Sequence, residues 1–309
     1  MRYIVTGGAG FIGSNLSEYL AHNHDITIID NLATGRFANI EHLLDQSNVT
    51  FIKGSITDYD LLMDVFPGAD GIFHQAAIPS VPRSINDPIA SNETNVSGTV
   101  NVLTAAKECK VPKIVAASSS SVYGDTPTLP KKEEMTPNPL SPYAVTKLAD
   151  EHYGRVFSNI FGIKTVFLRY FNVYGPRQDP KSEYAAVIPR FITRLLAGDS
   201  PIIFGDGEQT RDFTFIGDVV QANVKAMECD AEGIFNIAYG DYISLNSLAS
   251  SLMDIIGNRC SAIYKNSRAG DIRDSFADIT KARNAFGYFP AFPVEKGLRK
   301  TVEWFKENE

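Results

Sequence analysis

The stretch that decides the fold is Tyr3-Ile-Val-Thr-Gly-Gly-Ala-Gly-Phe-Ile-Gly13, close to the start of the chain. A short apolar run leads into a turn whose glycines stand at Gly7, Gly10 and Gly13. Glycine lets the backbone turn sharply and approach a ligand closely, and a helix that begins at such a turn directs its N–H groups at a phosphate. The stretch therefore predicts a phosphate-binding turn between a strand and a helix.

The residues that follow the turn strengthen this interpretation. Phe11, Leu16 and Leu20 have the spacing of one helix face. The apolar strand at 26–29 then ends at Asp30, a carboxylate placed to accept hydrogen bonds from a ribose diol. Strand, glycine turn, helix and acid together predict a dinucleotide-binding βαβ unit.

Strands and helices alternate along the first half of the chain. Apolar strands are predicted at 26–29, 49–52, 71–74, 113–117 and 164–168. Runs that are apolar on both faces suit a parallel sheet covered by helices on each side. We therefore expect an α/β fold with a doubly wound parallel (Rossmann) sheet and ligands beyond the carboxyl ends of its strands.

The alternation becomes irregular after Asn172, where prolines and glycines interrupt short apolar pieces. We expect residues 1–172 to form the dinucleotide-binding domain, completed by a returning segment near 213–240. Residues 173–212 and 241–309 are expected to form a smaller α/β cap that holds the substrate.

Composition argues against several classes of partner. The 309-residue chain has a net charge of −7 and no basic cluster, which disfavours nucleic acid. No apolar run approaches the roughly 20 residues that span a bilayer, and Arg2, followed directly by a core strand, leaves no room for a signal peptide. Cys109, Cys229 and Cys260 are far apart and lack metal-ligand spacing. We expect a soluble cytoplasmic protein with reduced thiols, no metal and no membrane partner.

A candidate reaction centre lies in the middle of the chain. Ser141 can cap a helix whose first position suits Pro142, which places Tyr143 and Lys147 one turn apart on the same face. A lysine ammonium near a phenol favours the phenolate and gives a usable general base. Ser118–Ser121 offer hydroxyls at the end of the preceding strand. Alone, the pair could be an ordinary helix start with a surface lysine, and the serines a polar loop.

Several motifs extend over essentially the whole chain. They are Thr6-Gly-Gly-Ala-Gly-Phe-Ile-Gly13, Asp30-Asn-Leu32, His74-Gln-Ala-Ala77, Ser118–Ser121 with Val122-Tyr-Gly124, Tyr143-x-x-x-Lys147, Arg169-Tyr-Phe-Asn-Val-Tyr-Gly-Pro176, Phe204-Gly-Asp-Gly-Glu-Gln-Thr-Arg-Asp-Phe213 and Arg268-Ala-Gly-Asp271. With them the chain resembles the extended short-chain dehydrogenases/reductases and, within that family, the nucleotide-sugar 4-epimerases.

The resemblance implies NAD as the cofactor. The cofactor-binding positions that it implies are Gly7, Gly10, Phe11, Ile12, Gly13, Asp30, Asn31, Thr34, Gly35, Ser55, Ile56, Gln75, Ala77, Tyr143 and Lys147. Asp30 favours NAD over NADP, because a 2′-phosphate would meet its negative charge. Ser55 departs from the family, since most relatives place an aspartate there to bond the adenine amino group. A neutral hydroxyl accepts that bond less strongly, and Asp58 lies too far along to replace it.

The resemblance also implies a mechanism. Tyr143 takes the proton from the sugar 4-hydroxyl, Ser119 hydrogen-bonds the same hydroxyl, and Lys147 holds the nicotinamide ribose. Hydride passes from C4 to NAD⁺, the 4-keto sugar rotates in the pocket, and the hydride returns to the opposite face. The implied substrate-binding positions are Ser119, Tyr143, Asn172, Val187, Phe204, Arg211, Arg268, Asp271 and Ser275.

Substrate choice is expected to depend on Ser275, the seventh position after Arg268. Relatives restricted to glucose and galactose carry a bulky tyrosine there, and serine opens room for an N-acetyl group. The chain is therefore expected to interconvert UDP-GlcNAc and UDP-GalNAc, with UDP-glucose and UDP-galactose turned over more slowly or bound more weakly.

Other readings of the chain stay open. One is a plain UDP-glucose 4-epimerase. Others are a uronate 4-epimerase or a decarboxylase, either of which would need a cation such as Arg83 near the sugar C5. A dinucleotide-binding regulator without catalysis is disfavoured by the Tyr143/Lys147 pair, and dehydration by the lack of an acidic pair after Ser119. The resemblance also suggests a homodimer through helices near 92–110 and 141–161.

Overall fold

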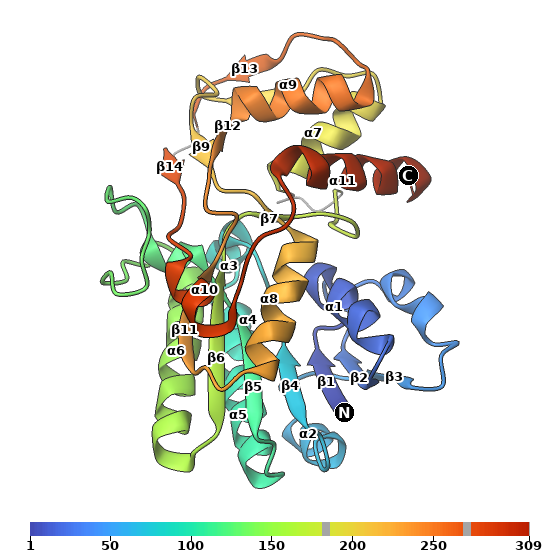
Figure 1. Ribbon diagram of the computed structural model, residues 1–309, viewed down its shortest axis with the longest axis vertical. Helices are drawn as coiled ribbons and strands as arrows, with labels where there is room; N and C mark the ends of the chain where they lie inside the picture. Colours follow the sequence, from blue (N-terminus) through green and yellow to red (C-terminus); the bar gives the residue numbers. More distant parts are fainter. Residues whose placement is uncertain (181–185, 268–272, 309) are drawn as a thin grey trace.

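A seven-stranded parallel sheet forms the centre of the protein (Figure 1). The computed structural model describes residues 1–180, 186–267 and 273–308. The strands are β1 (Arg2–Thr6), β2 (Asp25–Asp30), β3 (Val49–Lys53), β4 (Gly71–His74), β5 (Lys113–Ser119), β6 (Lys164–Tyr170) and β11 (Gly233–Ile237). Their order in the sheet is β11-β6-β5-β4-β1-β2-β3. The chain adds β2 and β3 on one side of β1 and then β4, β5, β6 and β11 on the other, so that β1 pairs with both β2 and β4. The doubly wound fold predicted from the sequence is confirmed.

Helices cover both faces of this sheet. They are α1 (Phe11–Ala21), α2 (Tyr59–Val65), α5 (Gly98–Glu108), α6 (Pro142–Phe161) and α8 (Ile216–Glu228). Helix α1 packs with α8 on one side, while α2, α5 and α6 pack together on the other. Neighbouring strand residues therefore enter different cores: Val5 and Ile28 belong to one apolar cluster, and Ile4 and Ile29 to the other. This two-sided burial explains why the strands are continuously apolar.

The connection from β4 to α5 is less regular than the sequence indicated. It runs through α3 (Val81–Asn86), α4 (Pro88–Asn92) and a π-helical turn, Glu93–Ser97, before α5 begins. The wide turn carries Asn95 into the interior, where its amide bonds both backbone groups of Ile78 and the Thr146 hydroxyl. The expected helix near 92–110 is therefore interrupted by a turn that serves the packing of a polar side chain.

Most of the remaining helices and strands gather above the carboxyl ends of the sheet strands, and the last helix but one packs against β11 (Figure 1). They are β7 (Val173–Tyr174), α7 (Val187–Leu196), β8 (Ile202–Phe204), β9 (Thr210–Arg211), β10 (Thr214–Phe215), β12 (Ile243–Ser244), α9 (Leu245–Ile256), β13 (Ile263–Lys265), β14 (Asp274–Ser275), α10 (Thr280–Phe286) and α11 (Val294–Asn308). Short strand pairs join them: β7 with β10, β8 with β13, and β9 with both β12 and β14.

Asp212 ties several of these segments together. Its buried carboxylate accepts hydrogen bonds from the backbone N–H groups of Tyr239, Gly240 and Ala277. Burial raises the pKa of Asp212 to about 7, although these backbone donors lower it in part. One side chain thus holds together three stretches of chain.

Candidate functional site

The glycine turn between β1 and α1 is closely packed. Gly7 has φ +69°, and a Cβ atom added there would lie 2.6 Å from the backbone of Ala76. A Cβ atom on Gly13 would lie 2.1 Å from the Gly7 carbonyl oxygen. Helix α1 begins just after Gly10, which provides no side-chain cap. The first N–H groups of α1 therefore face outward from a turn that only glycine fits, which suits a dinucleotide phosphate.

Asp30 stands beside this turn at the end of β2. Its carboxylate is buried and accepts hydrogen bonds from the N–H groups of Ala9, at 3.0 Å, and Leu32, at 2.8 Å. Burial raises the pKa of Asp30, and the two backbone donors lower it. A helix N-terminus and a carboxylate at adjoining strand ends form the arrangement that a pyrophosphate and a ribose diol need.

Ser55 and Asp58 each have a local hydrogen-bond partner. The Ser55 hydroxyl lies 2.8 Å from the Thr57 hydroxyl and accepts the Thr57 N–H at 3.2 Å. Asp58 caps α2 by accepting the Leu61 N–H at 3.1 Å. Asp58 therefore has a structural role of its own as the cap of α2.

The other expected cofactor positions lie around the same edge of the sheet. Asn31 and Thr34 are exposed after β2, and Ile56 is buried after β3. Phe11 and Ile12 in the first turn of α1, Gly35 next to Asp30, and Gln75 and Ala77 after β4 are half-buried. Gln75 donates to Asn223 on α8 at 3.0 Å, and Asn223 in turn contacts the Tyr170 hydroxyl. Asn223 and Tyr170 fix the Gln75 amide and were not identified from the sequence.

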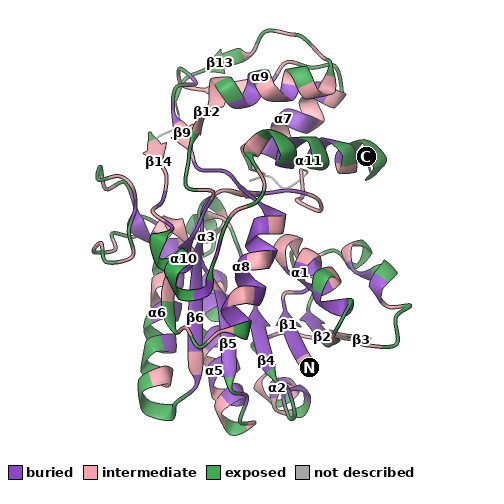
Figure 2. Cartoon of the chain, viewed as in Figure 1, coloured by how far each residue is buried: buried purple, intermediate pink, exposed green. Residues whose placement is uncertain are grey.

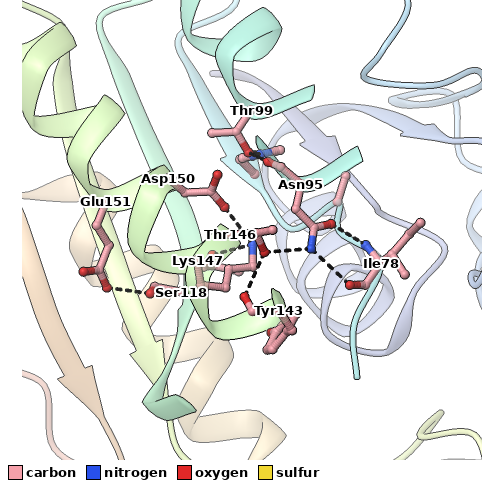
Figure 3. A network of polar contacts seen from close by, with 12 residues as sticks. Ile78, Asn95, Thr99, Ser118, Tyr143, Thr146, Lys147, Asp150 and Glu151 are labelled. Atoms are coloured by element: carbon pink, nitrogen blue, oxygen red, sulfur yellow. Dashed lines mark hydrogen bonds and ion pairs between the residues drawn. The ribbon is translucent and has the colours of Figure 1, made fainter. Parts of the chain in front are cut away.

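The start of α6 carries the candidate reaction centre as the sequence predicts. Ser141 caps the helix by accepting the Ala144 N–H at 3.2 Å, and a proline stands in the first turn. The Lys147 side chain is 3% exposed and donates to the Ala117 carbonyl of β5 at 3.1 Å (Figure 3). This contact sets the Tyr143–Lys147 face of α6 against the end of β5, which terminates at Ser119.

The four serines of the run differ in their surroundings. The buried Ser118 donates to Glu151 at 2.6 Å, and both carboxylate oxygens of Glu151 bind the buried Arg169 guanidinium. Ser118 is therefore held within the sheet–helix interface (Figure 3). Ser119 is half-buried, and its hydroxyl accepts the Ser121 N–H at 3.2 Å. This difference favours Ser119 over Ser118 as the hydroxyl available to a substrate.

A cavity of about 290 Å³ lies next to the ends of β6 and α7. It is lined by Asn172, Val173, Tyr174, Ala186, Val187, Ile188, Arg190, Phe191, Ile202, Phe204, Gln209, Arg211, Phe213 and Leu245. Four of the expected substrate positions, Asn172, Val187, Phe204 and Arg211, are thus brought together. The sequence did not identify Arg190, whose guanidinium lies 5.9 Å from the centre of the Phe204 ring.

Ser275 lies beside this cavity without being part of its lining. It stands on β14 directly opposite Arg211 in the β9–β14 register. Its backbone carbonyl accepts the Asp212 N–H at 2.9 Å. Arg268 and Asp271, the other two expected contacts of the diphosphate and ribose, lie outside the described residues.

A second set of polar residues near Lys147 was missed by the sequence interpretation. Asp150 contacts the Lys147 ammonium at 3.2 Å. The buried His74 ring lies between the Thr6 and Thr99 hydroxyls, at 2.7 and 3.0 Å. Only Asp150 has a local signal, because its position one turn after Lys147 places both on one helix face.

None of the helices in the described part of the chain is long and apolar enough to cross a membrane. Nor do the described side chains of histidine, cysteine, aspartate and glutamate form a group of three or more that could hold a metal ion.

Comparison with known proteins gives consistent relatives. The chain is 42% identical over 308 residues to a putative UDP-glucose 4-epimerase of Methanocaldococcus jannaschii, covering 99% of this chain and 98% of the relative. A solved UDP-N-acetylglucosamine 4-epimerase from Methanobrevibacter ruminantium, in complex with UDP-N-acetylmuramic acid, is 39% identical with a TM-score of 0.97 over 100% of this chain and 99% of that one. A UDP-glucuronic acid 4-epimerase from Bacillus cereus, in complex with UDP-glucuronic acid and NAD, is 36% identical with a TM-score of 0.91 over 100% of both chains.

The family model confirms the predicted cofactor and class of enzyme. Residues 3–238 match the model described as the NAD dependent epimerase/dehydratase family. The match includes the glycine turn, Asp30, the serine run and the Tyr143/Lys147 pair. The chain therefore belongs to the NAD dependent epimerase/dehydratase family and is an isomerase of the epimerase type.

Proposed function

We propose that this protein is a UDP-sugar 4-epimerase that interconverts UDP-GlcNAc and UDP-GalNAc and turns over UDP-glucose and UDP-galactose less efficiently. The observation that carries the proposal is the contact between the Lys147 ammonium and the Ala117 carbonyl. This contact sets the face of α6 that carries Tyr143 and Lys147 against the end of β5, where Ser119 stands.

NAD fits the edge of the sheet at the switch between β1 and β4. The uncapped start of α1 would hold the pyrophosphate, and Asp30 would accept from the adenosine ribose. The positions around Asn31, Thr34, Gly35, Ser55 and Ile56 would surround the adenosine half, and those around Gln75 and Ala77 the nicotinamide half. We assign this role to residues 1–172 with 213–240, and substrate binding to 173–212 with 241–309.

The reaction is assigned to three side chains. Tyr143, as phenolate, accepts the proton of the sugar 4-hydroxyl and later returns it. Ser119 hydrogen-bonds the same oxygen and keeps it facing the phenol. Lys147 favours the phenolate through its charge and donates to the nicotinamide ribose. Bound NAD supplies the acceptor and donor of hydride, so the protein has to position groups rather than provide redox chemistry.

The cavity suits a uridine diphosphate. Val187 and Phe204 give it apolar walls, while Asn172 and Arg211 provide polar groups. The Arg211 guanidinium also donates to two backbone carbonyls, which fixes the direction of its planar fork. A fork held in this way can bond two phosphate oxygens at once. Arg268 and Asp271 are assigned to the diphosphate and ribose by their motif alone.

The preference for N-acetylated sugars is assigned to Ser275. Its place opposite Arg211 on β14 puts a small side chain next to the wall of the cavity. The solved relative at 39% identity is a UDP-N-acetylglucosamine 4-epimerase, which supports the assignment. Extra room does not reject the smaller sugar, because filling such a pocket contributes only about 1–3 kcal/mol.

A uronate 4-epimerase is the second candidate. Arg83 is half-buried on α3, and the next residue, Ser84, accepts the Tyr143 N–H at 3.0 Å. The arginine therefore comes from the segment that packs against the start of α6, where a sugar carboxylate could approach. A relative of this type is 36% identical.

We also propose a homodimer formed through the helices near 92–110 and 141–161, the second of which is α6. Val145, Tyr153, Val156 and Ile160 repeat at helical spacing on α6 and are 53%, 42%, 44% and 67% exposed. Figure 2 shows exposed residues along this helix. Such an apolar stripe on a long helix is typical of a surface that a second copy covers.

A panel of UDP-sugars tests the proposed function. Purified protein is incubated with UDP-GlcNAc, UDP-glucose and UDP-glucuronate separately, and the products are resolved by NMR. We expect UDP-GalNAc from the first and a slower conversion of the second. Conversion of UDP-glucose alone would replace the proposal with a plain UDP-glucose 4-epimerase, and conversion of the uronate alone would select the second candidate.

A further inference from the structure

Asp150 is a buried carboxylate on α6 that the proposed mechanism does not use. Its side chain is 1% exposed and lies one helical turn beyond Lys147. One oxygen, Oδ2, lies 3.2 Å from the Lys147 ammonium. Figure 3 shows the two side chains directed at each other, with Thr99 near the other side of the carboxylate.

The contact restricts the direction of the Lys147 ammonium. An ammonium has three N–H donors. One points to the Ala117 carbonyl at 3.1 Å and a second to Asp150. With two acceptors at fixed places, rotation about the terminal C–N bond is blocked and the third donor has a single direction.

The charged groups around Asp150 come from several elements. Lys147 and Glu151 face it from α6, and Glu151 is already paired with Arg169 of β6. His74 of β4 is kept neutral, because burial and the Lys147 charge lower its pKa to about 3. Lys147 is therefore the single nearby cation among the described residues that Asp150 can neutralise.

The other carboxylate oxygen, Oδ1, lacks a hydrogen-bond partner among the described residues. The Thr99 hydroxyl lies near it and donates its one proton to the Asn95 carbonyl. Burial raises the pKa of Asp150 to about 6, against the opposing effect of Lys147. A buried ion pair whose carboxylate has one oxygen without a hydrogen-bond partner contributes little to stability. The stability of the fold therefore does not account for Asp150, and its effect on Lys147 remains as the explanation.

We propose that Asp150 is a positioning residue for the reaction, which orients the Lys147 ammonium and, through its negative charge, sets the pH range in which Tyr143 and Lys147 act. The proposal rests on the proposed function of that pair. The carboxylate gives the buried ammonium a counter-charge at 3.2 Å, and its negative charge opposes the attraction between that ammonium and the phenol.

The two effects predict shifts in the same direction when the charge is removed. Without a counter-ion, the buried Lys147 ammonium loses its proton more readily. Without the neighbouring negative charge, the Tyr143 phenol also ionises more readily. Both limbs of the profile of kcat/KM against pH therefore move to lower pH in Asp150→Asn, the acid limb by about half a pH unit and the basic limb by about one unit or more.

Asp218→Asn is the matched control. Asp218 is likewise buried, and burial raises its pKa to about 6. Asp218 stands at the start of α8. Its carboxylate accepts hydrogen bonds from the backbone N–H groups of Ala291, at 2.7 Å, and Phe292, at 3.3 Å. Removing this charge tests whether any buried aspartate alters the profile, and both limbs should stay at their wild-type positions.

A second readout follows the phenol itself. Tyrosinate formation is recorded by ultraviolet difference absorbance, and the titration of Tyr143→Phe is subtracted to isolate Tyr143. We expect the isolated titration to lie at lower pH in Asp150→Asn than in wild type. Asp150→Ser removes the same charge with a smaller side chain and must give the same shift, which covers a failure of Asp150→Asn to fold.

The outcomes separate the two proposals. Wild-type activity in Tyr143→Phe would overturn the proposed function. An inactive Tyr143→Phe together with unshifted pH profiles and an unshifted tyrosinate titration in the Asp150 variants would overturn the role of Asp150 alone. Equal shifts in Asp150→Asn and Asp218→Asn would also overturn it, because they would reflect a general effect of buried charge.

Discussion

At the scale of single residues, the proposed reaction depends on one phenol at the start of α6. Tyr143→Phe removes the hydroxyl and keeps the ring, so the helix start and the sugar pocket should keep their packing. Loss of a general base typically costs on the order of 10²–10⁴ in rate. We expect 4-epimerisation of UDP-sugars to collapse in a coupled assay, while UDP-sugar binding, measured by calorimetry, stays close to wild type. Turnover near the wild-type rate would exclude Tyr143 as the base.

The serine run allows a comparison between neighbours. Ser119 and Ser120 are both half-buried, but only Ser119 belongs to β5, the strand whose Ala117 carbonyl accepts from Lys147. We expect Ser119→Ala to lower kcat more than Ser120→Ala, since the substrate 4-hydroxyl loses its second hydrogen-bond partner. The two variants are compared by steady-state kinetics on the same substrate. The reverse order would shift the assignment of the catalytic serine by one residue.

Substrate choice is also a single-residue matter in this proposal. Ser275→Tyr puts a ring where the 2-substituent is expected, next to Arg211. The variant should lose activity on UDP-GlcNAc and UDP-GalNAc and keep it on UDP-glucose and UDP-galactose, which are followed in parallel by NMR. Retained activity on the N-acetylated pair would place Ser275 away from the sugar.

Single residues were predictable from the sequence where spacing along the chain defined them. Tyr143 and Lys147 stand one turn apart, and the glycine turn is defined by glycines that lie within a few residues of one another. The partner of Ser118 could not be inferred in this way. Glu151 is joined to it only when α6 packs on β5, and to Arg169 only when β6 lies alongside. Contacts of this kind arise from tertiary packing that no local pattern records.

At the scale of elements, apolar runs in the sequence predicted the sheet strands β2 to β6 well. Two residues define the ends of helix α9 (Leu245–Ile256): Ser244 caps its start, and Gly257 adopts a left-handed conformation at its end. The π-helical turn Glu93–Ser97 was missed. Its cause is the buried Asn95 amide, whose partners Ile78 and Thr146 come from other parts of the chain.

The outer face of α6 provides a prediction about assembly. Ile160→Glu combined with Val145→Glu places two charges on the apolar stripe, where burial in a dimer would leave them unpaired. We expect wild type to have about twice the 33.9 kDa chain mass in analytical ultracentrifugation and the double variant to be a monomer.

Tyr19→Glu serves as the control for this variant. Tyr19 lies on α1 and is 55% exposed, so it tests an added charge at an apolar surface residue away from α6. The control should keep the mass of wild type. A wild-type monomer, or a double variant that still dimerises, would contradict the proposed interface.

At the scale of the whole molecule, buried titratable groups make stability depend on pH. Burial raises the pKa of Asp150 to about 6, of Asp212 to about 7 and of Asp218 to about 6. In the folded protein these groups hold protons at a pH where the unfolded chain has released them. Their contribution to the free energy of unfolding therefore increases as the pH falls from about 7 toward about 4.

His74 acts in the opposite direction. Its ring lies between the Thr6 and Thr99 hydroxyls in the core, and burial, with the Lys147 charge, lowers its pKa from 6.5 to about 3. Between these two values the unfolded chain binds a proton that the folded protein does not. The stability from His74 is complete above pH 6.5 and falls below it by about 1.4 kcal/mol per pH unit.

His74→Gln isolates this contribution from that of the aspartates, because it removes the titrating ring and leaves the carboxylates in place. Urea unfolding of wild type and variant is measured at pH 7.5 and pH 5.0, and the change between the two pH values is compared. Because His74 changes the stability only below pH 6.5, the free energy of unfolding of wild type should fall by about 2 kcal/mol more than that of the variant between pH 7.5 and pH 5.0. The change in wild type has to be compared with the change in the variant, because the raised pKa values of the aspartates offset part of the loss of stability in both proteins. Equal changes in the two proteins would mean that His74 is protonated in the folded state, with its ring donating to both threonine hydroxyls.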